Sequence, residues 1–448
     1  MNLQTRKILD RSFSGAGLLA IAWMAAALLV LLAPMTVRGL RAVFFQGTIE
    51  HRRFLLEKFE RGDRMVVDAE IRVAGAARAP VWNLLVDFDR QLAAGDAATR
   101  ARYRLPLKEL RKELHFLLGP EPGKPRSPLL RDQFGQTRMD LAQLGLERVL
   151  WREEWDYSNP AQGGVRRLKP RADDFADTPL VELFPYVKQN LAAMLLPHWT
   201  FYWGFWTDES CDAHFFGGIW PEILGTFYLT IGTLLLAVPM GVIAAIYLTE
   251  YARASHLLTV LRTCNNTLAG VPSIVFGLFG LAFFINTAHV SPSKSVLAGS
   301  LTLALMILPT VIRASEEAIK AVPRTYKEAA LSLGAGRWHA VWSAVLPAAL
   351  PGILTGIVIS MGRAAGETAP IIFTAAVSVG KPLALWQTLT QPTPALSWNI
   401  YNLATEHEAA DLVRHVQYGL VLTLVGLVLL LNLAAIILRA RIARKLRN

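Results

Sequence analysis

Long apolar runs without a single Asp, Glu, Lys or Arg recur along the 448-residue chain. Most come close to the roughly 20 residues that a helix needs to cross a lipid bilayer, or exceed them. This pattern predicts an all-α polytopic membrane protein with six transmembrane helices. The runs lie at residues 12–37, 223–249, 263–293, 295–312, 338–362 and 415–438.

The basic residues that flank these runs are unevenly distributed. Lys and Arg gather in the N-terminal tail, in residues 313–340 and at the C-terminus, while the short loops on the other side hold Lys294, Lys381 and Arg414. By the positive-inside rule, both termini are then cytoplasmic. The first run is too long for a secretory signal and "LLAPMTV" has no small-x-small cleavage site, so we expect a retained helix. Topology thus explains the net charge of +11, and no nucleic-acid partner is expected.

A long segment of different texture separates the first run from the second. Acidic and basic residues nearly balance there, and Pro and Gly clusters such as "LLGPEPGKPRSP" indicate surface loops. "TIEHRRFLLEKFERGD" predicts an amphipathic helix and "RMVVDAEIRV" a strand, so we expect an α+β insert outside the membrane. The predicted parts are residues 1–37 with the first helix, the insert 38–217 outside the membrane, which in a bacterial cell is the periplasm, and a membrane core 218–448.

The end of this insert is rich in aromatic residues. The stretch "LLPHWTFYWGFWTDE" fits either an aromatic girdle at the membrane interface or the insert's own core. On the second run, Thr226, Thr230 and Thr233 form a polar stripe at helical spacing. Such a stripe either lines a path through the membrane or bonds neighbouring helices.

The loop before the fifth run, within residues 313–347, has a turn signature of its own. In "VPRTYKEAALSLGAGRWHAVWSAVLP", Pro323 suits the start of a helix, and Gly334 and Gly336 suit a stop followed by a turn. Two short helices are therefore predicted to protrude into the cytoplasm. "EAALSLGA", followed by Leu346 and Pro347, resembles the EAA loop of ABC-importer permeases, with Ala344 as a mild departure from the usual Ile.

That resemblance implies docking into a separate ATPase subunit. The residues placed in this coupling element are Glu328, Ala329, Ala330, Gly334, Gly336 and Arg337. The chain contains no "GxxxxGK[ST]" phosphate-binding loop, so we expect a transporter subunit and no enzyme. ATP and Mg²⁺ would be used by the partner ATPase, and we expect no cofactor or metal to be bound by this chain.

The stretch "GRAAGETAP" places two charges directly after the fifth run, close to the middle of a span that would extend from about Leu350 to about Thr374. An Arg at the centre of a membrane span costs about 3 kcal/mol, which makes Arg363 a functional candidate. A spacing of four lets Arg363 pair with Glu367, and Pro370 predicts a kink beside them. Gly352, Gly356 and Ser360 continue a small-xxx-small packing rhythm on the same face. We place Arg363, Glu367, Ser360 and the three threonines on a substrate path; the alternative is a structural ion pair.

Three stretches carry a closer resemblance, over about residues 217–448. "GTFYLTIGTLLLAVPMGVIAAIYLTEYA", "NTLAGVPSIVFGLFGL" and "GRAAGETAPIIFTA" resemble PstA-type permeases of bacterial phosphate ABC transporters. The resemblance implies the type I ABC-importer permease fold in the bacterial inner membrane. It also implies phosphate import by alternating access with a second permease, an ATPase dimer and a periplasmic phosphate-binding protein. The alternatives are another oxyanion, such as sulfate or molybdate, or a scaffold that signals phosphate status to a sensor system.

Overall fold

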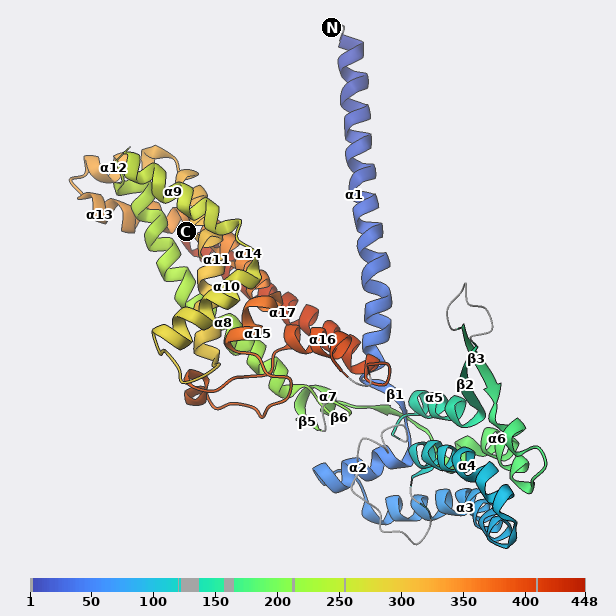
Figure 1. Cartoon of the computed structure of the whole chain (residues 1–448). Helices are drawn as coiled ribbons and strands as arrows, with labels where there is room; N and C mark the ends of the chain where they lie inside the picture. The colour runs from blue at the N-terminus through green and yellow to red at the C-terminus, as the bar shows by residue number, and fades with distance from the viewer. Residues whose placement is uncertain are drawn as a thin grey trace. The chain divides into compact units, whose positions relative to one another are not determined.

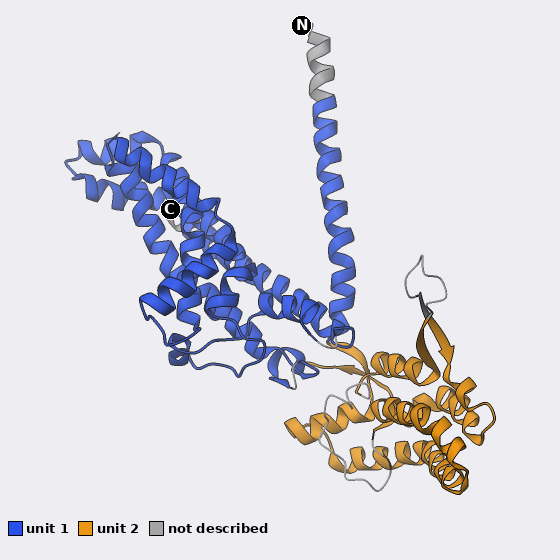
Figure 2. Cartoon of the chain, viewed as in Figure 1, with its two compact units in different colours: residues 1–42, 204–448 blue, residues 43–203 orange. Residues whose placement is uncertain are grey.

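The computed structural model describes residues 3–119, 121, 137–156, 165–211, 214–253, 255–407 and 410–447. The chain forms two compact units (Figure 2), which are described separately: unit 1 comprises residues 1–42 and 204–448, and unit 2 comprises residues 43–203. Unit 2 is shorter at both ends than the predicted insert. The first helix continues to Leu40, and beyond Trp203 the chain packs into unit 1, where Phe205 lies against Gly419.

Unit 2 is mostly helical with small β elements. Its core is built from leucines on α4 and α6, among them Leu110, Leu114 and Leu183, which are fully buried. Strands β1 and β4 pair antiparallel, as do β2 and β3. The elements are β1 (Phe44–Gly47), α2 (Ile49–Phe59), α3 (Arg64–Ala94), α4 (Ala97–Leu118), α5 (Met139–Leu150), β2 (Trp151–Asp156), β3 (Val165–Pro170), α6 (Leu183–Leu195) and β4 (His198–Phe201), with 3₁₀ turns at Arg171–Phe175 and Pro179–Glu182.

The predicted helix at the start of the insert is confirmed as α2, whereas the strand predicted from "RMVVDAEIRV" is wrong. That stretch opens α3, where the Asp63 side chain caps the helix by accepting from Met65 N. The buried residues of α3, including Val67, Ala74 and Val81, follow a helical period over its 31 residues. The alternation of apolar and polar residues in this short stretch therefore belongs to one end of a long helix, whose buried face continues beyond it. The cluster "LLGPEPGKPRSP" falls mostly outside the described residues.

The aromatic stretch divides between the two interpretations. On β4 and just after it, Trp199, Phe201 and Trp203 are largely exposed, whereas Tyr202 is buried. This alternation is that of an extended chain, whose successive side chains point to opposite faces. Phe205 is also buried, but it lies beyond the extended part, in the short helix α7 (Gly204–Thr207). The extended part of the stretch thus buries Tyr202 on one face and presents aromatic rings on the other.

A buried histidine lies near this sheet in unit 2. The ring of His51 makes edge contacts with Phe45 at 5.1 Å and Tyr202 at 5.3 Å, and its Nε2 is buried without a hydrogen-bond partner among the described residues. Burial, assisted by the positive charges of Arg138 and Arg52, lowers the pKa of His51 from 6.5 to about 3. His51 is consequently neutral at physiological pH.

We therefore expect unit 2 to lose stability on acidification. The unfolded chain binds this proton near pH 6.5, and the folded chain only near its pKa of about 3, so stability is full above about pH 6.5 and falls below it. The loss is about 2 kcal/mol at about pH 5. Thermal unfolding of unit 2 followed by tryptophan fluorescence would measure it. His51→Phe, which keeps the ring contacts, should abolish this part of the pH dependence; an unchanged slope would contradict the assignment.

Unit 1 holds the helices that are long and apolar enough to cross a membrane. Figure 1 shows α12 and α13 at one end of this unit and α16, β5 and β6 toward the other, which we call the outer end. The elements are α1 (Leu3–Leu40), α7 (Gly204–Thr207), β5 (Ser210–Cys211), β6 (Phe216–Gly217), α8 (Trp220–Ile246), α9 (His256–Ala269), α10 (Ser273–Gly280), α11 (Val296–Lys320), α12 (Arg324–Ser332), α13 (Arg337–Ala340), α14 (Leu346–Gly366), α15 (Ala369–Thr374), α16 (Leu396–Thr405) and α17 (Arg414–Arg447). Turns of π-helix follow α8, α10 and α13, and a 3₁₀ turn lies at Leu385–Leu389.

Five of the six predicted spans coincide with long apolar helices, and the third run differs. Residues 263–293 do not form one straight helix: α9 and the following helix (Ser273–Thr287) are bent by 101° across a short break. The break falls at "GVPS", where Pro272 caps α10 and cannot continue α9. The described residues thus provide five candidate spans, or six if the bent pair counts as one.

Helix α11 is the centre of unit 1. In the most apolar part of α11, 67% of the residues are buried, compared with 0% for α1 and 6% for α17. It packs against α8 through a core that includes Leu229, Leu303 and Ile307, and α14 lies along another of its faces. Helix α1 contacts α17 near Gly39, where Arg38 donates to the Tyr418 hydroxyl at 2.7 Å. The rest of α1 therefore has a surface suited to lipid or to another membrane chain.

Candidate functional site

Arg363 lies in the last turn of α14 and interacts with Glu367. Its Nε donates to Glu367 Oε1 at 3.2 Å, so the ion pair predicted from the spacing is present. The Arg363 side chain is 40% exposed and that of Glu367 is 22% exposed. The guanidinium has donors beyond the one used by Glu367, and these remain accessible to a second anion.

The helix does not continue past this pair, which corrects the expectation of a kinked but continuous helix. Helix α14 ends at Gly366, and Glu367 is extended, with φ −74° and ψ 130°. Helix α15 then starts at Ala369 with Pro370 in its first turn, where a missing N–H costs no hydrogen bond. The proline therefore starts a new helix, and Arg363 lies near the end of α14 instead of at mid-span.

A small cavity of about 10 Å³ adjoins this break. Glu367, Thr226 and Ser397 provide its polar lining, from the α14–α15 break, α8 and α16 respectively. The remaining lining is apolar and includes Leu229, Leu303, Ala364 and Ala395. The cavity has room for about one water molecule, so in this conformation it does not hold a larger anion.

Helix α16 connects α8 to the break. Thr226 Oγ1 accepts from Leu396 N at 2.9 Å, which joins the start of α16 to α8. One residue on, Ser397 Oγ donates to the Glu367 carbonyl at 3.2 Å, and Thr368 Oγ1 donates to the Ser397 carbonyl at 3.3 Å. Leu396 and Ser397 could not be predicted from the sequence, because these contacts span 170 and 30 residues and no local motif marks them.

The other path candidates are buried in helix packing. Thr230 and Thr233 donate to the carbonyls of Thr226 and Leu229 on their own helix, at 2.7 and 2.6 Å. Ser360 is fully buried, and its hydroxyl has no partner among the described residues. A role for these three on the substrate path stays a prediction.

The small residues of α14 face small residues of α11. A Cβ added at Gly352 would lie 2.7 Å from Ala318 Cβ, and one added at Gly356 would lie 2.3 Å from Ala314 Cβ. The two helices approach closely along this seam because neither side carries a large side chain. The seam holds α14, and with it Arg363, against the central helix.

The coupling element has the predicted shape of two short helices joined at glycines. Helices α12 and α13 are separated by Gly334, whose φ of +84° favours glycine, and Gly336, whose φ is −67°. Trp338 and Trp342 stack at 5.6 Å and are more than half exposed, as is Leu333. Glu328, Ala329 and Arg337 are exposed as well, and Ala330 is half-buried. The loop therefore presents an exposed surface suited to a partner.

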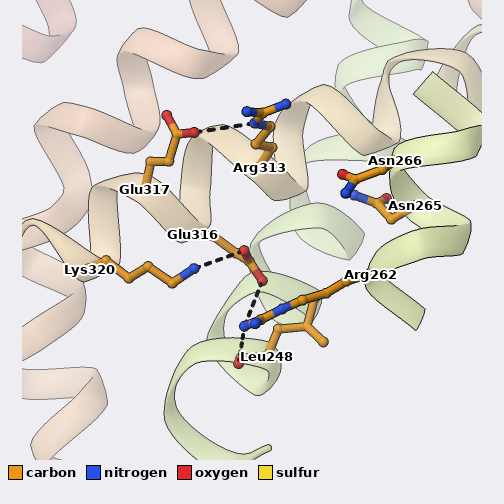
Figure 3. Close-up of a pocket in the computed structure, with 8 residues that line it drawn as sticks. All are labelled: Leu248, Arg262, Asn265, Asn266, Arg313, Glu316, Glu317 and Lys320. Carbon is orange, nitrogen blue, oxygen red and sulfur yellow. Dashed lines mark hydrogen bonds and ion pairs between the residues drawn. The ribbon is translucent and has the colours of Figure 1, made fainter. Parts of the chain in front are cut away.

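Two polar features lie near α12 and α13, at the end of unit 1 opposite the outer end, which we call the inner end. Lys327 of α12 pairs with Glu250 in the π-turn after α8, so the loop is tied to the core. A cavity of about 270 Å³, shown in Figure 3, is lined by residues of α9, α11 and the end of α8. In it, Arg313 pairs with Glu317 and Lys320 pairs with Glu316, toward which Arg262 also points. Most of its lining charges are thus mutually compensated.

The comparisons with known proteins identify the family. Residues 237–448 match the model for the binding-protein-dependent transport system inner membrane component. The chain is 33% identical over 276 residues to the probable ABC transporter permease protein YqgI of Bacillus subtilis, covering 60% of this chain and 91% of that protein. It is 35% identical over 247 residues to the phosphate transport system permease protein PstA 1 of Mycobacterium tuberculosis, covering 54% and 78%. The chain belongs to the PstA-type ABC transporter permeases.

A PstA-type permease is the membrane component of a bacterial importer, and ATP hydrolysis belongs to an ATPase partner. The chain is therefore a multi-pass inner-membrane protein that works with an ATPase and a binding protein. Among solved structures, it is similar to an inward-facing methionine ABC transporter, MetNI, at 18% identity and a TM-score of 0.39, covering 50% of this chain and 94% of that chain. The family assignment rests on the sequence relatives.

Proposed function

We propose that this chain is the transmembrane permease subunit of an ATP-driven importer of inorganic phosphate. The observation that carries the proposal is the placement of Arg363: a partly exposed guanidinium in the last turn of α14, beside the break before α15, paired with Glu367. An Arg fork suits the oxygens of phosphate, and its charge persists at every physiological pH. The relatives named as phosphate transport permeases support the same substrate.

The mechanism we propose gives the two charged residues separate tasks. Glu367 neutralises Arg363 when the site is empty, which lowers the cost of holding a cation in the membrane core. When phosphate arrives from the outer end, it replaces Glu367 as the counter-ion of Arg363. The cavity at the break is too small for phosphate in this conformation, so passage requires α14, α15 and α16 to separate.

The proposal includes a set of partners. A second, related permease would complete the membrane core, and an ATPase dimer would dock on α12 and α13 of this chain and on the matching loop of its partner. A periplasmic binding protein would deliver phosphate at the outer end of unit 1. In this topology both termini are cytoplasmic, and unit 2 is the periplasmic insert. A phosphate-responsive sensor system is a further partner that the insert could contact.

The substrate is tested by competition. Vesicles containing the full complex are expected to accumulate labelled phosphate only with internal ATP and external binding protein. Excess unlabelled phosphate should abolish the signal, whereas sulfate and molybdate should leave it within about twofold, because at neutral pH only phosphate carries an O–H that a specific site can recognise by a hydrogen bond. Accumulation of sulfate or molybdate in place of phosphate would reassign the permease to that oxyanion.

A further inference from the structure

Three buried polar side chains meet at the outer end of α8 and belong to no part of the site above. His214 Nε2 lies 2.9 Å from Glu222 Oε1, and Asn399 Nδ2 lies 3.1 Å from the same oxygen. His214 and Asn399 are themselves 3.2 Å apart. The side chains of Glu222 and Asn399 are wholly buried, and that of His214 is 2% exposed. Removing a carboxyl group from water in this way costs free energy unless hydrogen bonds or an opposite charge compensate for it.

Two acceptor atoms of this triad have no partner among the described residues: Glu222 Oε2 and Asn399 Oδ1. They are the second oxygen of the carboxyl and the oxygen of the amide that already donates to it. A neutral carboxylic acid and a primary amide form a cyclic pair, in which the amide N–H donates to one carboxyl oxygen and the acid O–H donates to the amide oxygen. A single proton on Glu222 Oε2 would supply the missing half of that pair.

We propose that the triad is a proton-binding site, in which one exchangeable proton resides on Glu222 Oε2 and is shared with Asn399 Oδ1. With the proton bound, neutral His214 donates from Nε2 to Glu222 Oε1, both orphaned acceptors are satisfied, and the triad carries no net charge. Without it, a carboxylate is buried with two acceptors unpaired, which is the costly arrangement for polar groups away from water. The protonated form thus leaves fewer buried acceptors without a donor.

Other charged and titratable groups lie on the neighbouring elements. Among the described residues they are Asp208 and Glu209 before β5, Cys211 in it, Glu406 and His407 just after α16, Asp411 before α17, and Arg414 and His415 at its start. Asp411 and Arg414 pair with each other at 2.6 Å, and the His407 ring packs against Phe215 at 5.1 Å.

The proton would hold α16 on α8. Thr226, one turn beyond Glu222, donates to the Glu222 carbonyl and accepts from the start of α16, and Ser397 then bonds the Glu367 carbonyl. Close packing supports this connection, since a Cβ on Gly225 would lie 2.0 Å from the Pro394 carbonyl oxygen. Loss of the proton would therefore loosen the backbone at the α14–α15 break. This last step rests on the proposed function, whereas the proton site itself does not.

Infrared difference spectroscopy tests the site without any transport. Full-length protein in lipid nanodiscs should show the C=O band of a buried carboxylic acid, which shifts when H₂O is replaced by D₂O because the proton on Glu222 exchanges. Glu222→Gln should remove this band, and Asn399→Leu should shift it. Glu317→Gln, which removes an exposed carboxyl of α11, should leave it in place. A spectrum of Glu222→Gln identical to that of the parent would overturn the proposal.

Transport tests the consequence. Gln at position 222 imitates the protonated acid, so Glu222→Gln should hold α16 on α8 and keep phosphate uptake within about twofold of that of the parent. Glu222→Leu removes the hydrogen bonds to His214 and Asn399, so it should loosen the break that has to open for passage and change uptake by about tenfold. Equal uptake by the two variants would refute the link between the proton and the break. Absence of phosphate uptake in the parent and both variants would instead count against the proposed function, while the infrared result would still decide the proton site.

Discussion

Arg363→Gln is expected to lower ATP-driven phosphate uptake by about a hundredfold or more while the transporter complex still assembles. Removing one charged donor from a preorganised anion site typically costs a factor of this size. Gln retains hydrogen-bonding capacity and similar length but loses the charge and the fork. It also leaves Glu367 as an uncompensated carboxylate facing the substrate path, which would repel an incoming anion.

A matched control is available on the central helix. Arg313 pairs with Glu317 at the same spacing of four and at a similar distance, 3.3 Å, but both side chains are about 70% exposed at the inner end. Exposed pairs of this kind contribute little. Arg313→Gln should therefore leave uptake within about twofold. Labelled-phosphate uptake in vesicles measures both variants, and co-purification with the ATPase reports assembly. Normal uptake by Arg363→Gln would rule out the proposed role.

The double variant Arg363→Gln/Glu367→Gln separates the two explanations for the pair. If the pair only fixes helix register, removing both charges should restore uptake, because no unpaired charge remains. If Arg363 binds the anion, uptake stays low in the double variant. We expect the second outcome, because the pair is too exposed to be a strong structural element.

The parts of this protein that the sequence predicted well are those determined by local signals. Apolar run length predicted five of the spans, and Pro323 with Gly334 predicted the shape of the coupling element, because each feature depends on residues near one another in the chain. Apolar content, however, does not distinguish a straight helix from a bent one. The bend between α9 and α10 depends on Gly270 and Pro272, which lie within an otherwise uninterrupted run.

The candidate site was predictable only in part, for the same reason. Arg363 and Glu367 are four residues apart, so their pairing could be predicted from the spacing. The support for that pair comes from α16, through Ser397, and the triad joins residues 177 and 185 positions apart. His214 and Asn399 have no motif around them, and Glu222 lies just before an apolar run where it looks like an ordinary interfacial acid. Only tertiary packing brings such groups together.

Gly334→Val is expected to reduce association with the ATPase, and with it uptake, by about tenfold or more. Gly334 has φ +84°, a conformation that costs a residue with a Cβ about 1–2 kcal/mol and a β-branched residue more. The chain would avoid this cost by changing the turn between α12 and α13. That change would move Glu328 and Ala329 relative to Trp338 and Trp342, and so separate the two halves of the exposed coupling surface.

Two controls separate backbone strain from a steric clash with the partner. Among the described residues, no atom lies within 4 Å of a Cβ added at Gly334 or Gly336, so neither substitution collides with this chain itself. Gly336→Val introduces the same side chain at φ −67°, where it is unstrained, and Gly334→Asn introduces a residue that tolerates positive φ. If strain is the cause, both controls retain association, measured by co-purification and by substrate-stimulated ATP hydrolysis. If Gly334→Asn fails as badly as Gly334→Val, the partner itself approaches Gly334, and the turn geometry is not what the coupling element requires.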